Sequence, residues 1–275
     1  MDTPQPQTTI VSCYYALHNN KKRSLESYQA WISTFLQACT NPIVMFSDGP
    51  VADSLDAYRK SISPEHAKRW LLIRRPYESL PFTHSDWASY WQTMLEQNTC
   101  RSVYQTEIFI LYANKTKFLK EVILLNPFQT PTFYWCDAGC WRHPDFALRE
   151  GPGWPHSPSP TRLQLSWVSN LDACRRAAEP LHSLEEFMEH LPVRNQVTVG
   201  GAMFGGPAQA CLAFCDTVSL LFDLYRKHQK YGSDDQCILA TAGLFLERAQ
   251  LVDNIPPSIP PPGGDEWFAL QYYRI

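Results

Sequence analysis

Short apolar runs alternate with amphipathic segments along the first half of the chain. Residues 8–17 (TTIVSCYYAL) are rich in β-branched and aromatic side chains, and residues 43–47 (IVMFS) form a second run of this kind. Both runs predict strands. Between them, residues 25–38 place apolar side chains at helical spacing behind Ser24, a residue type that favours helix starts. A strand, a helix and a strand in this order predict a βαβ unit of a parallel sheet.

The alternation continues along the rest of the chain. Residues 70–74 predict a third strand, and helical spacing predicts helices from Ser85 and over residues 106–125. In the second half, the same spacing predicts helices over residues 183–190 and 207–229, the latter opened by a proline. We therefore expect an α/β fold with a central sheet flanked by helices.

Composition predicts one domain with two halves and a tail at each end. Residues 1–7 are polar and predict a flexible tail. A loop rich in Pro, Gly and Ser (EGPGWPHSPSP) separates the two halves of the domain. Residues 255–275 begin with a polyproline-like run and predict a C-terminal tail, whose last apolar segment is either an edge strand or docked. The domain is expected over residues 8–254, with halves 8–149 and 150–254.

A run of large apolar residues ends on a single carboxylate near the middle of the chain. Residues 132–145 read TFYWCDAGCWRHPD, which predicts a short buried strand followed by Asp137. Since α/β sheets bind ligands at the carboxyl ends of their strands, Asp137 is predicted to face the diphosphate of a sugar nucleotide, directly or through a divalent metal. The alternative is that Asp137 caps a turn in which Gly139 supplies an unusual backbone angle.

Other polar candidates lie on the first half of the chain. Asp48 follows the second predicted strand, where an acid often contacts the ribose or base of a nucleotide, although a plain turn residue explains it slightly better. The helix over residues 106–125 carries Lys115, Lys117 and Lys120. Most of these lysines are expected at the surface, and periodicity does not select one that points toward phosphate.

Two glycine pairs interrupt a predicted strand in the second half, in the run VTVGGAMFGG. Gly200-Gly201 and Gly205-Gly206 weaken a strand unless another chain or a ligand approaches the backbone closely. They do not form a phosphate-binding loop, because no Gly-Lys-Ser/Thr follows. A sugar lying against bare backbone and a tight chain crossing both explain them.

An acidic cluster, Asp234-Asp235-Gln236, precedes an apolar helical segment. One interpretation is a helix cap, with Ser233 or Asp234 as the capping residue, and the local sequence favours it. The other makes Asp235 or Asp234 a catalytic base or an anchor for a hydroxyl group.

Charge and cysteine usage narrow the class of protein. The chain has 275 residues and a formal net charge of −3, so it has no basic excess to hold a nucleic acid. Its 9 cysteines lie in apolar segments and predict reduced, buried thiols; the spacing of Cys136 and Cys140 has no second pair to complete a zinc site. No secretory signal and no run long enough to span a bilayer is recognised, so a cytoplasmic location is expected by default.

Several motifs occur in one order: TIVSCYYAL, IVMFSD, an NPF at the end of a helix, YWCDAGCWR, VGGAMFGG and DDQ. This series resembles the HtrL/YibB-type family of glycosyltransferase-like proteins, related to WlaTC proteins of bacterial surface-glycan loci. The resemblance covers roughly residues 8–246. It implies a GT-A-like fold with a mixed sheet, in which the nucleotide-binding half is residues 8–149 and the acceptor half is residues 150–254.

The resemblance also implies roles for individual residues. GT-A enzymes generally hold a divalent metal, Mn²⁺ or Mg²⁺, on the donor diphosphate through a D-x-D motif. The matching stretch here is Asp137-Ala138-Gly139, so the second acid is missing. Either the metal, with Asp137 as its ligand, is in doubt, or its second ligand is a His or Asp of the second half. The implied donor-binding residues are Tyr14, Tyr15, Asp48, Lys115, Asp137, Ala138, Gly139 and Arg142; those implied to face the acceptor or transferred sugar are Gly200, Gly201, Gly205, Gly206, Asp234, Asp235 and Gln236.

The expected activity is transfer of a sugar, hexosyltransferase-like, from a nucleotide-sugar donor to a carbohydrate or small-molecule acceptor. Lys115 or Arg142 would support the leaving phosphate, and in an inverting enzyme Asp235 would take the acceptor's proton. In a retaining enzyme Asp235 would only bind substrate. An alternative is a catalytically inactive protein of the same fold that binds nucleotide sugars or glycans. A hydrolase or methyltransferase is disfavoured, because the chain lacks a G-x-S-x-G elbow and a glycine-rich loop after the first strand.

Overall fold

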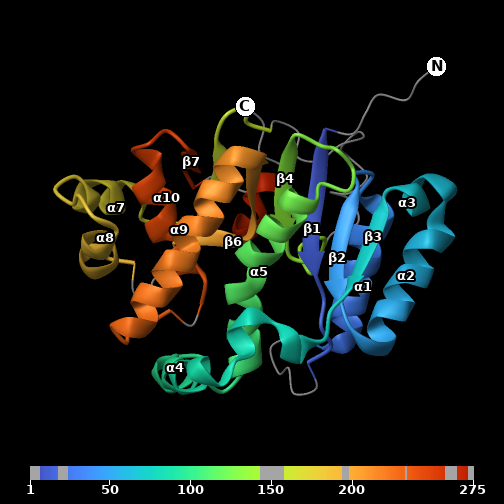
Figure 1. The fold of residues 1–275 in the computed structure, drawn as a ribbon, viewed down its shortest axis with the longest axis horizontal. Coiled ribbons are helices and arrows are strands. Elements are labelled where there is room, and N and C mark those ends of the chain that lie inside the picture. Colours follow the sequence, from blue (N-terminus) through green and yellow to red (C-terminus); the bar gives the residue numbers. More distant parts are fainter. Residues whose placement is uncertain are drawn as a thin grey trace.

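A computed structural model shows a mixed sheet with helices on both faces, which confirms the expected α/β architecture (Figure 1). It describes residues 7–17, 24–142, 158–193, 198–232, 234–257 and 265–271. Within these ranges the sheet has seven strands in the order β3-β2-β1-β4-β6-β5-β7. The strands are β1 (Thr8–Cys13), β2 (Ile43–Ser47), β3 (Trp70–Arg74), β4 (Thr132–Cys136), β5 (Leu163–Trp167), β6 (Val199–Pro207) and β7 (Val252–Ile255).

The first half of the sheet is parallel. β1 pairs with β2, and β2 pairs with β3, in parallel register, as the strand-helix-strand pattern predicts. The crossover from β1 to β2 runs through α1 (Leu25–Ala38), where the side chain of Ser24 accepts a hydrogen bond from the Ser27 backbone N–H. The crossover from β2 to β3 runs through α2 (Gly49–Ile62) and α3 (Pro64–Lys68).

The order of the strands reverses at β1. β2 lies on one side of β1 and β4 lies on the other, with Ile10 opposite Tyr134 in a parallel pair. The crossovers that leave β1 and enter β4 therefore run in opposite directions across the sheet. This geometry opens a crevice at the carboxyl ends of the two strands, which is where open α/β sheets bind ligands.

β6 alone runs against the other described strands. It pairs antiparallel with both β4 and β5, while β5 and β7 are parallel to each other. The glycines at its C-terminal end fit between these neighbours: a Cβ on Gly205 would collide with the backbone of Phe133, and one on Gly206 would lie 2.5 Å from the Arg162 carbonyl oxygen. The close chain approach accounts for this second pair of glycines.

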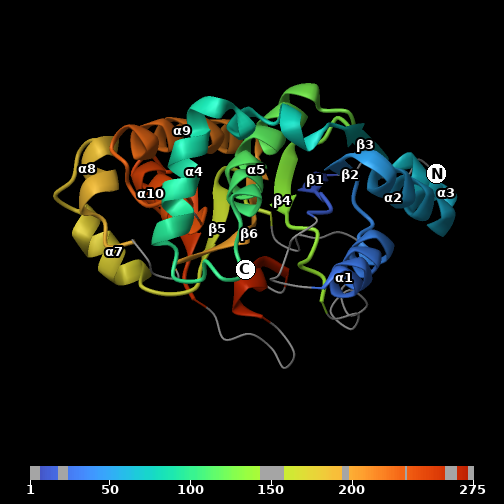
Figure 2. The same ribbon diagram turned by 90° about the horizontal axis from the view of Figure 1, so that it is seen from below.

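Alternating side chains of the strands form two separate cores. Val11, Val44 and Trp135 point to one face, while Ile10, Met45 and Tyr134 point to the other. Figure 2 shows α5 and α9 on one side of the sheet, with α1 and the C-terminal segment on the other. The helices on the first face are α4 (Ser85–Gln97), α5 (Thr106–Leu125), α7 (Leu171–Ala178), α8 (Leu184–His190), α9 (Ala208–Lys227) and α10 (Gln236–Glu247).

Helix α9 is long and apolar enough, by length and composition, to cross a membrane. Half of its most apolar window is buried within the fold, where α9 packs against α5 and α10. A core helix of this kind passes the same test, so the finding is weak evidence. The expectations of no spanning segment and of a cytoplasmic location stay predictions.

The C-terminal part of the chain joins the sheet and its second core. Residues 252–255 form the edge strand β7, which is parallel to β5, so the sheet extends across residue 254. The 3₁₀ segment η3 (Glu266–Gln271) packs against β6, where a Cβ on Gly200 would lie 2.8 Å from the Trp267 carbonyl oxygen. Of the two expectations for the last apolar segment, the docked one is confirmed for residues 265–271. Two further 3₁₀ turns lie between β3 and α4, at η1 (Tyr77–Ser79) and η2 (Pro81–Thr83).

Candidate functional site

A cavity of about 170 Å³ lies at the crevice between β1 and β4. Cys13, Tyr14 and Tyr15 reach it from the end of β1, and Asp137 to Gly139 reach it from the end of β4. The helix α5 runs along its side, because Ile108, Leu111, Tyr112 and Lys115 share one helical face. The remaining lining residues are Leu17, Leu25, Tyr28, Trp31, Trp135, Arg142 and Phe268.

Asp137 lines this cavity from the turn that follows β4. Its backbone N–H donates to the Ala202 carbonyl oxygen at 2.8 Å, and its own carbonyl oxygen accepts from Cys140 N–H at 3.0 Å. The backbone therefore makes a tight turn and leaves the side chain, 31% exposed, at the cavity. The indole N–H of Trp135 donates to Asp137 Oδ1 at 2.6 Å and fixes the orientation of the carboxylate.

Gly139, in the turn after Asp137, does not have the unusual backbone angle that the turn alternative predicts. Among the described glycines, a left-handed backbone angle occurs at Gly49 and not at Gly139. A Cβ on Gly139 would instead lie 3.1 Å from Tyr28 Cε1. The glycine is therefore explained by the close approach of an aromatic ring, and the prediction of an unusual backbone angle is wrong.

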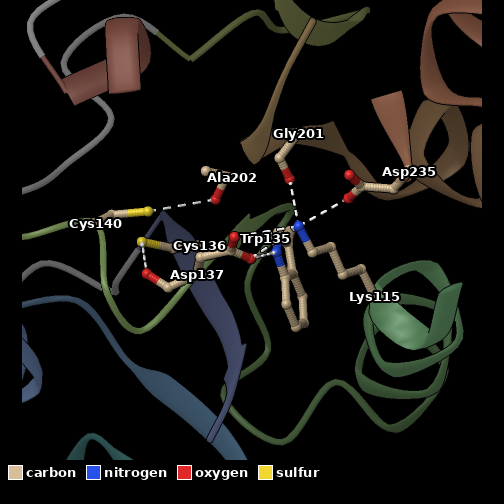
Figure 3. A network of polar contacts seen from close by, with 8 residues as sticks. All are labelled: Lys115, Trp135, Cys136, Asp137, Cys140, Gly201, Ala202 and Asp235. Atoms are coloured by element: carbon tan, nitrogen blue, oxygen red, sulfur yellow. Dashed lines mark hydrogen bonds and ion pairs between the residues drawn. The ribbon is translucent and has the colours of Figure 1, made fainter. Parts of the chain in front are cut away.

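Lys115 links Asp137 to a second carboxylate (Figure 3). Its Nζ lies 3.1 Å from Asp137 Oδ2 and 2.8 Å from Asp235 Oδ2, and it donates to the Gly201 carbonyl oxygen at 2.9 Å. The side chain is 5% exposed, and Nζ lies 4.7 Å from the centre of the Tyr112 ring. Burial by itself lowers the pKa of Lys115, but Asp137 and Asp235 outweigh burial and raise the pKa above its ordinary value.

Asp235 lies on the far side of Lys115 from Asp137. It takes the N-cap position of α10, but its side chain makes no capping hydrogen bond. Of the two residues predicted to cap this helix, Asp234 does not take the cap position and Ser233 lies outside the described residues. The Asp235 side chain is 8% exposed and does not line the cavity. A Cβ on Gly201 would lie 3.0 Å from its Oδ1, so glycine is needed for the carboxylate to approach β6. Burial raises the pKa of Asp235, and Lys115 offsets this only in part.

The neighbours of Asp235 turn away from the cavity. Asp234 Oδ2 accepts a hydrogen bond from the Tyr231 hydroxyl at 3.4 Å. Gln236 Oε1 accepts from the Thr198 backbone N–H at 3.4 Å. Gly201 contributes its carbonyl oxygen to Lys115, whereas Gly200, Gly205 and Gly206 serve close packing. None of these six residues lines the described cavity.

Asp48 also lies outside the cavity. It precedes α2, and its Oδ2 accepts a hydrogen bond from the Tyr77 backbone N–H at 2.9 Å. The contact ties the loop after β3 to the end of β2. The plain turn interpretation therefore accounts for Asp48.

Aromatic rings form the wall opposite α5. Tyr14 and Tyr28 have ring centres 5.9 Å apart, and Tyr28 meets Trp31 edge-on at 5.5 Å. Burial raises the pKa of Tyr14. Tyr15 is deeper, stacked on Phe118, and its buried hydroxyl has no hydrogen-bond partner among the described residues.

Arg142 lines the cavity between α1 and η3. Its guanidinium carbon lies 4.7 Å from the ring centres of both Trp31 and Phe268, so the cation is held between α1 and η3. Nε donates to the Gly139 carbonyl oxygen at 3.3 Å and Nη1 to Asp265 at 3.1 Å. A guanidinium carries five N–H donors, so these two contacts do not use its whole hydrogen-bonding capacity.

Sequence reasoning missed part of the aromatic wall. Tyr28 and Trp31 belong to the apolar face predicted for residues 25–38, but their rings line the cavity rather than the core. Phe268 comes from the segment predicted to be a tail. The available signal was chemical: tyrosine and tryptophan combine a flat apolar face with a polar edge, which suits a ligand surface.

Among the described residues, the carboxylates beside the cavity already have a cation as their partner. Asp137 and Asp235 are the two carboxylates that converge here, and both already share the ammonium of Lys115. Within the part of the chain that the structure describes, no three His, Cys, Asp or Glu side chains gather closely enough to hold a metal ion. Cys136 and Cys140 are free thiols whose Sγ atoms face backbone carbonyl oxygens.

Fold and site together define an α/β protein with a mixed sheet and an aromatic cavity, built around a buried ammonium and a carboxylate at the point where the strand order reverses. Residues 6–242 match the family HtrL_YibB, described as a bacterial protein of unknown function. The chain belongs to this family, as its motifs indicate. A comparison with curated proteins finds no match to the chain.

Proposed function

We propose that this protein is a glycosyltransferase with a GT-A-like fold, which moves a sugar from a nucleotide-sugar donor to a carbohydrate or small-molecule acceptor. The observation that carries the proposal is the composition of the cavity at the β1–β4 crevice. There, aromatic rings, a rigidly held carboxylate and an arginine meet in one concave space. Each group matches one part of a nucleotide sugar.

The aromatic wall suits the flat parts of the donor. Tyr14, Tyr28 and Trp31 offer ring faces on which a nucleobase or the apolar face of a sugar can stack. The buried Tyr15 hydroxyl beside the cavity can gain a hydrogen bond from a bound ligand. The carboxylate of Asp137 accepts hydrogen bonds only, so it suits sugar hydroxyls.

The leaving diphosphate needs a cation. As the glycosidic bond breaks, negative charge develops on the diphosphate, and a positive group nearby stabilises this change. Arg142 is in place for this role, because it lines the cavity and a guanidinium has N–H donors beyond the two contacts described above, which suit phosphate oxygens. Lys115 is less suited to direct contact, since its ammonium is enclosed by Asp137, Asp235 and Gly201.

Deprotonation of the acceptor needs a carboxylate if the reaction inverts configuration. Asp235 has a raised pKa, which suits a proton acceptor, but it lies buried behind Gly201. We therefore assign Asp235 first the task of holding Lys115, and its role as a base stays a prediction. The alternative of an inactive binding protein shares the donor cavity and differs only in turnover.

A thermal-shift panel tests donor binding. UDP-, GDP-, dTDP-, CDP- and ADP-sugars are each added to the full chain, with EDTA or with Mn²⁺. A ligand that binds only the folded state raises the melting temperature. We expect one nucleotide class to raise it, and Asp137→Asn and Arg142→Gln to remove the effect. The absence of any shift across the panel would contradict the proposal.

A further inference from the structure

The ammonium of Lys115, in the middle of α5, is enclosed by oxygen atoms from three separate parts of the chain. Two carboxylates from separate parts of the chain, Asp137 after β4 and Asp235 before α10, converge on its Nζ at 3.1 and 2.8 Å. The Gly201 carbonyl oxygen approaches from a third side at 2.9 Å. Carboxylate and carbonyl oxygens that converge on one point are the ligands that hard cations such as Mg²⁺ and Ca²⁺ prefer.

In this protein an ammonium already occupies that point. An ammonium donates three hydrogen bonds, and three oxygen-bearing groups surround it. The contact with Asp235 is an ion pair without the alignment of a hydrogen bond. Because Lys115 is enclosed, a divalent ion could reach the same oxygens only by displacing it or by approaching a like charge at short range.

The sequence agrees with this geometry. A divalent ion on a diphosphate is commonly held by one or two carboxylates of the protein. Here the residue two places after Asp137 is Gly139, which packs on Tyr28 and carries no ligand. The second carboxylate, Asp235, comes from the other half of the chain and faces Lys115 instead of the cavity.

We propose that the Lys115 ammonium is the resident cation of this site, in the place of a divalent metal, and that the site binds the diphosphate of its donor without one. Binding of the diphosphate without a metal rests on the proposed function, whereas the role of Lys115 as the resident cation does not. Lys115 is then a positioning residue that holds Asp137 toward the cavity. Arg142 is the cation that meets the phosphate oxygens.

Titration with the metal alone tests whether Lys115 is the resident cation. Mn²⁺ is titrated into the full chain, and free Mn²⁺ is followed by its electron paramagnetic resonance signal. Any binding of Mn²⁺ by wild type is expected to be unchanged when Asp137 is replaced by asparagine. Lys115→Met removes the ammonium and leaves two carboxylates without their cation. This variant is therefore expected to bind Mn²⁺ at least about tenfold more tightly than wild type does. Adding Asp137→Asn to Lys115→Met should abolish that site.

Lys117→Met is the matched control. Lys117 lies on the same helix, but its Nζ donates to Ser219 Oγ at 2.9 Å and reaches no carboxylate of this site. This variant should behave like wild type in the titration. If Lys115→Met folds only when Mn²⁺ is present, the rescue itself supports the proposal, and it is seen as a rise in melting temperature. If it does not fold under either condition, the wild-type titration decides.

Binding of nucleoside diphosphates tests whether the site binds the donor diphosphate without a divalent metal. Isothermal titration of UDP, GDP, dTDP, CDP and ADP is carried out in EDTA and in Mn²⁺. The affinity of the class that binds should agree within about twofold between the two conditions. A gain of about tenfold or more in Mn²⁺, or a wild-type Mn²⁺ site that Asp137→Asn removes, would overturn the inference while leaving glycosyl transfer intact. If no nucleotide binds in either condition, the proposed function fails, while the Mn²⁺ titration still decides the role of Lys115.

Discussion

The ammonium of Lys115 lies 3.1 Å from Asp137 Oδ2, and this contact joins the middle of α5 to the carboxyl end of β4. Trp135, two residues before the acid, fixes the other carboxylate oxygen. Asp137 is therefore held from the helix layer and from its own strand at the same time. A carboxylate held in this way is preorganised, so it loses little freedom when a ligand binds.

Arg142→Gln should weaken the binding of the diphosphate part of the donor. The substitution removes the charge but keeps a polar side chain between Trp31 and Phe268. Because hydrogen bonds to charged groups contribute about 1.5–3 kcal/mol, we expect a loss of affinity of about 10- to 100-fold. Isothermal titration with the nucleoside diphosphate that binds wild type measures it. Arg101→Gln, at an exposed turn, is the control; equal affinities in wild type and Arg142→Gln would remove Arg142 from the site.

Asp235→Asn should reveal a dependence of stability on pH. Burial raises the folded-state pKa of Asp235 above its ordinary value of 3.8, so the folded protein binds this proton more tightly than the unfolded chain does. The contribution of this group to the unfolding free energy therefore falls as pH rises through the window above 3.8. Asparagine cannot titrate, so the stability of wild type relative to Asp235→Asn should increase on acidification.

Urea unfolding of wild type and Asp235→Asn at about pH 7 and about pH 4.5 measures this difference. A relative loss of wild-type stability on acidification would show that Lys115 outweighs burial and lowers the pKa of Asp235.

The same pair of proteins also tests Asp235 as a base. If Asp235 only holds Lys115, the variant should keep a pH profile of kcat with the same limbs as wild type at a reduced level, whereas a base would lose its own limb.

Arg59→Met should destabilise the fold without changing the site. Arg59 is fully buried on α2. Its guanidinium donates to the carbonyl oxygens of Leu36, in the last turn of α1, and of Cys39 and Asn41, which follow that helix. Burial lowers its pKa to about 10, so it stays charged at neutral pH. Losing these bonds should cost about 2–4 kcal/mol of unfolding free energy. Urea unfolding checks this value.

Arg74→Met is the control for Arg59, because Arg74 pairs with Asp53 at the surface and should contribute less than about 1 kcal/mol. Neither variant should alter nucleotide affinity, since neither arginine lines the cavity. An Arg59→Met protein as stable as wild type would show that water replaces the guanidinium at the end of α1.

Local patterns predicted the elements that carry their own signal. Residues 106–125 became α5 with the same bounds, and the strands before Tyr14, Asp48 and Asp137 were predicted, because each has a continuous apolar or amphipathic pattern. β5 and β7 were not predicted. β7 has four residues and is followed by a proline-rich run that masks its pattern. β5 has five residues, as β2 to β4 do, and follows a loop rich in Pro, Gly and Ser.

The site was predicted in its parts but not in its connections. Lys115, Lys117 and Lys120 look alike in sequence, and the docking of α5 decides that Lys115 is buried while the other two face Ser219 and Asp216 on α9. The ion pair between Lys115 and Asp235 joins distant parts of the chain, so no local pattern encodes it. Ala138, Gly139, Tyr14 and Tyr15 line the cavity, whereas Asp48 and Gln236 do not. The binding roles that the resemblance implies for these residues stay predictions.

Release of nucleoside diphosphate from the nucleotide sugar that binds is the most direct test of glycosyl transfer, with and without candidate acceptor glycans. Wild type should turn over the donor, and acceptor should accelerate the release. Asp137→Asn should fold with a wild-type circular dichroism spectrum yet lose about 10²-fold or more in rate, while Asp53→Asn, an exposed carboxylate on α2, should not. Full activity in Asp137→Asn, or no turnover by wild type of any donor that it binds, would contradict the proposed function.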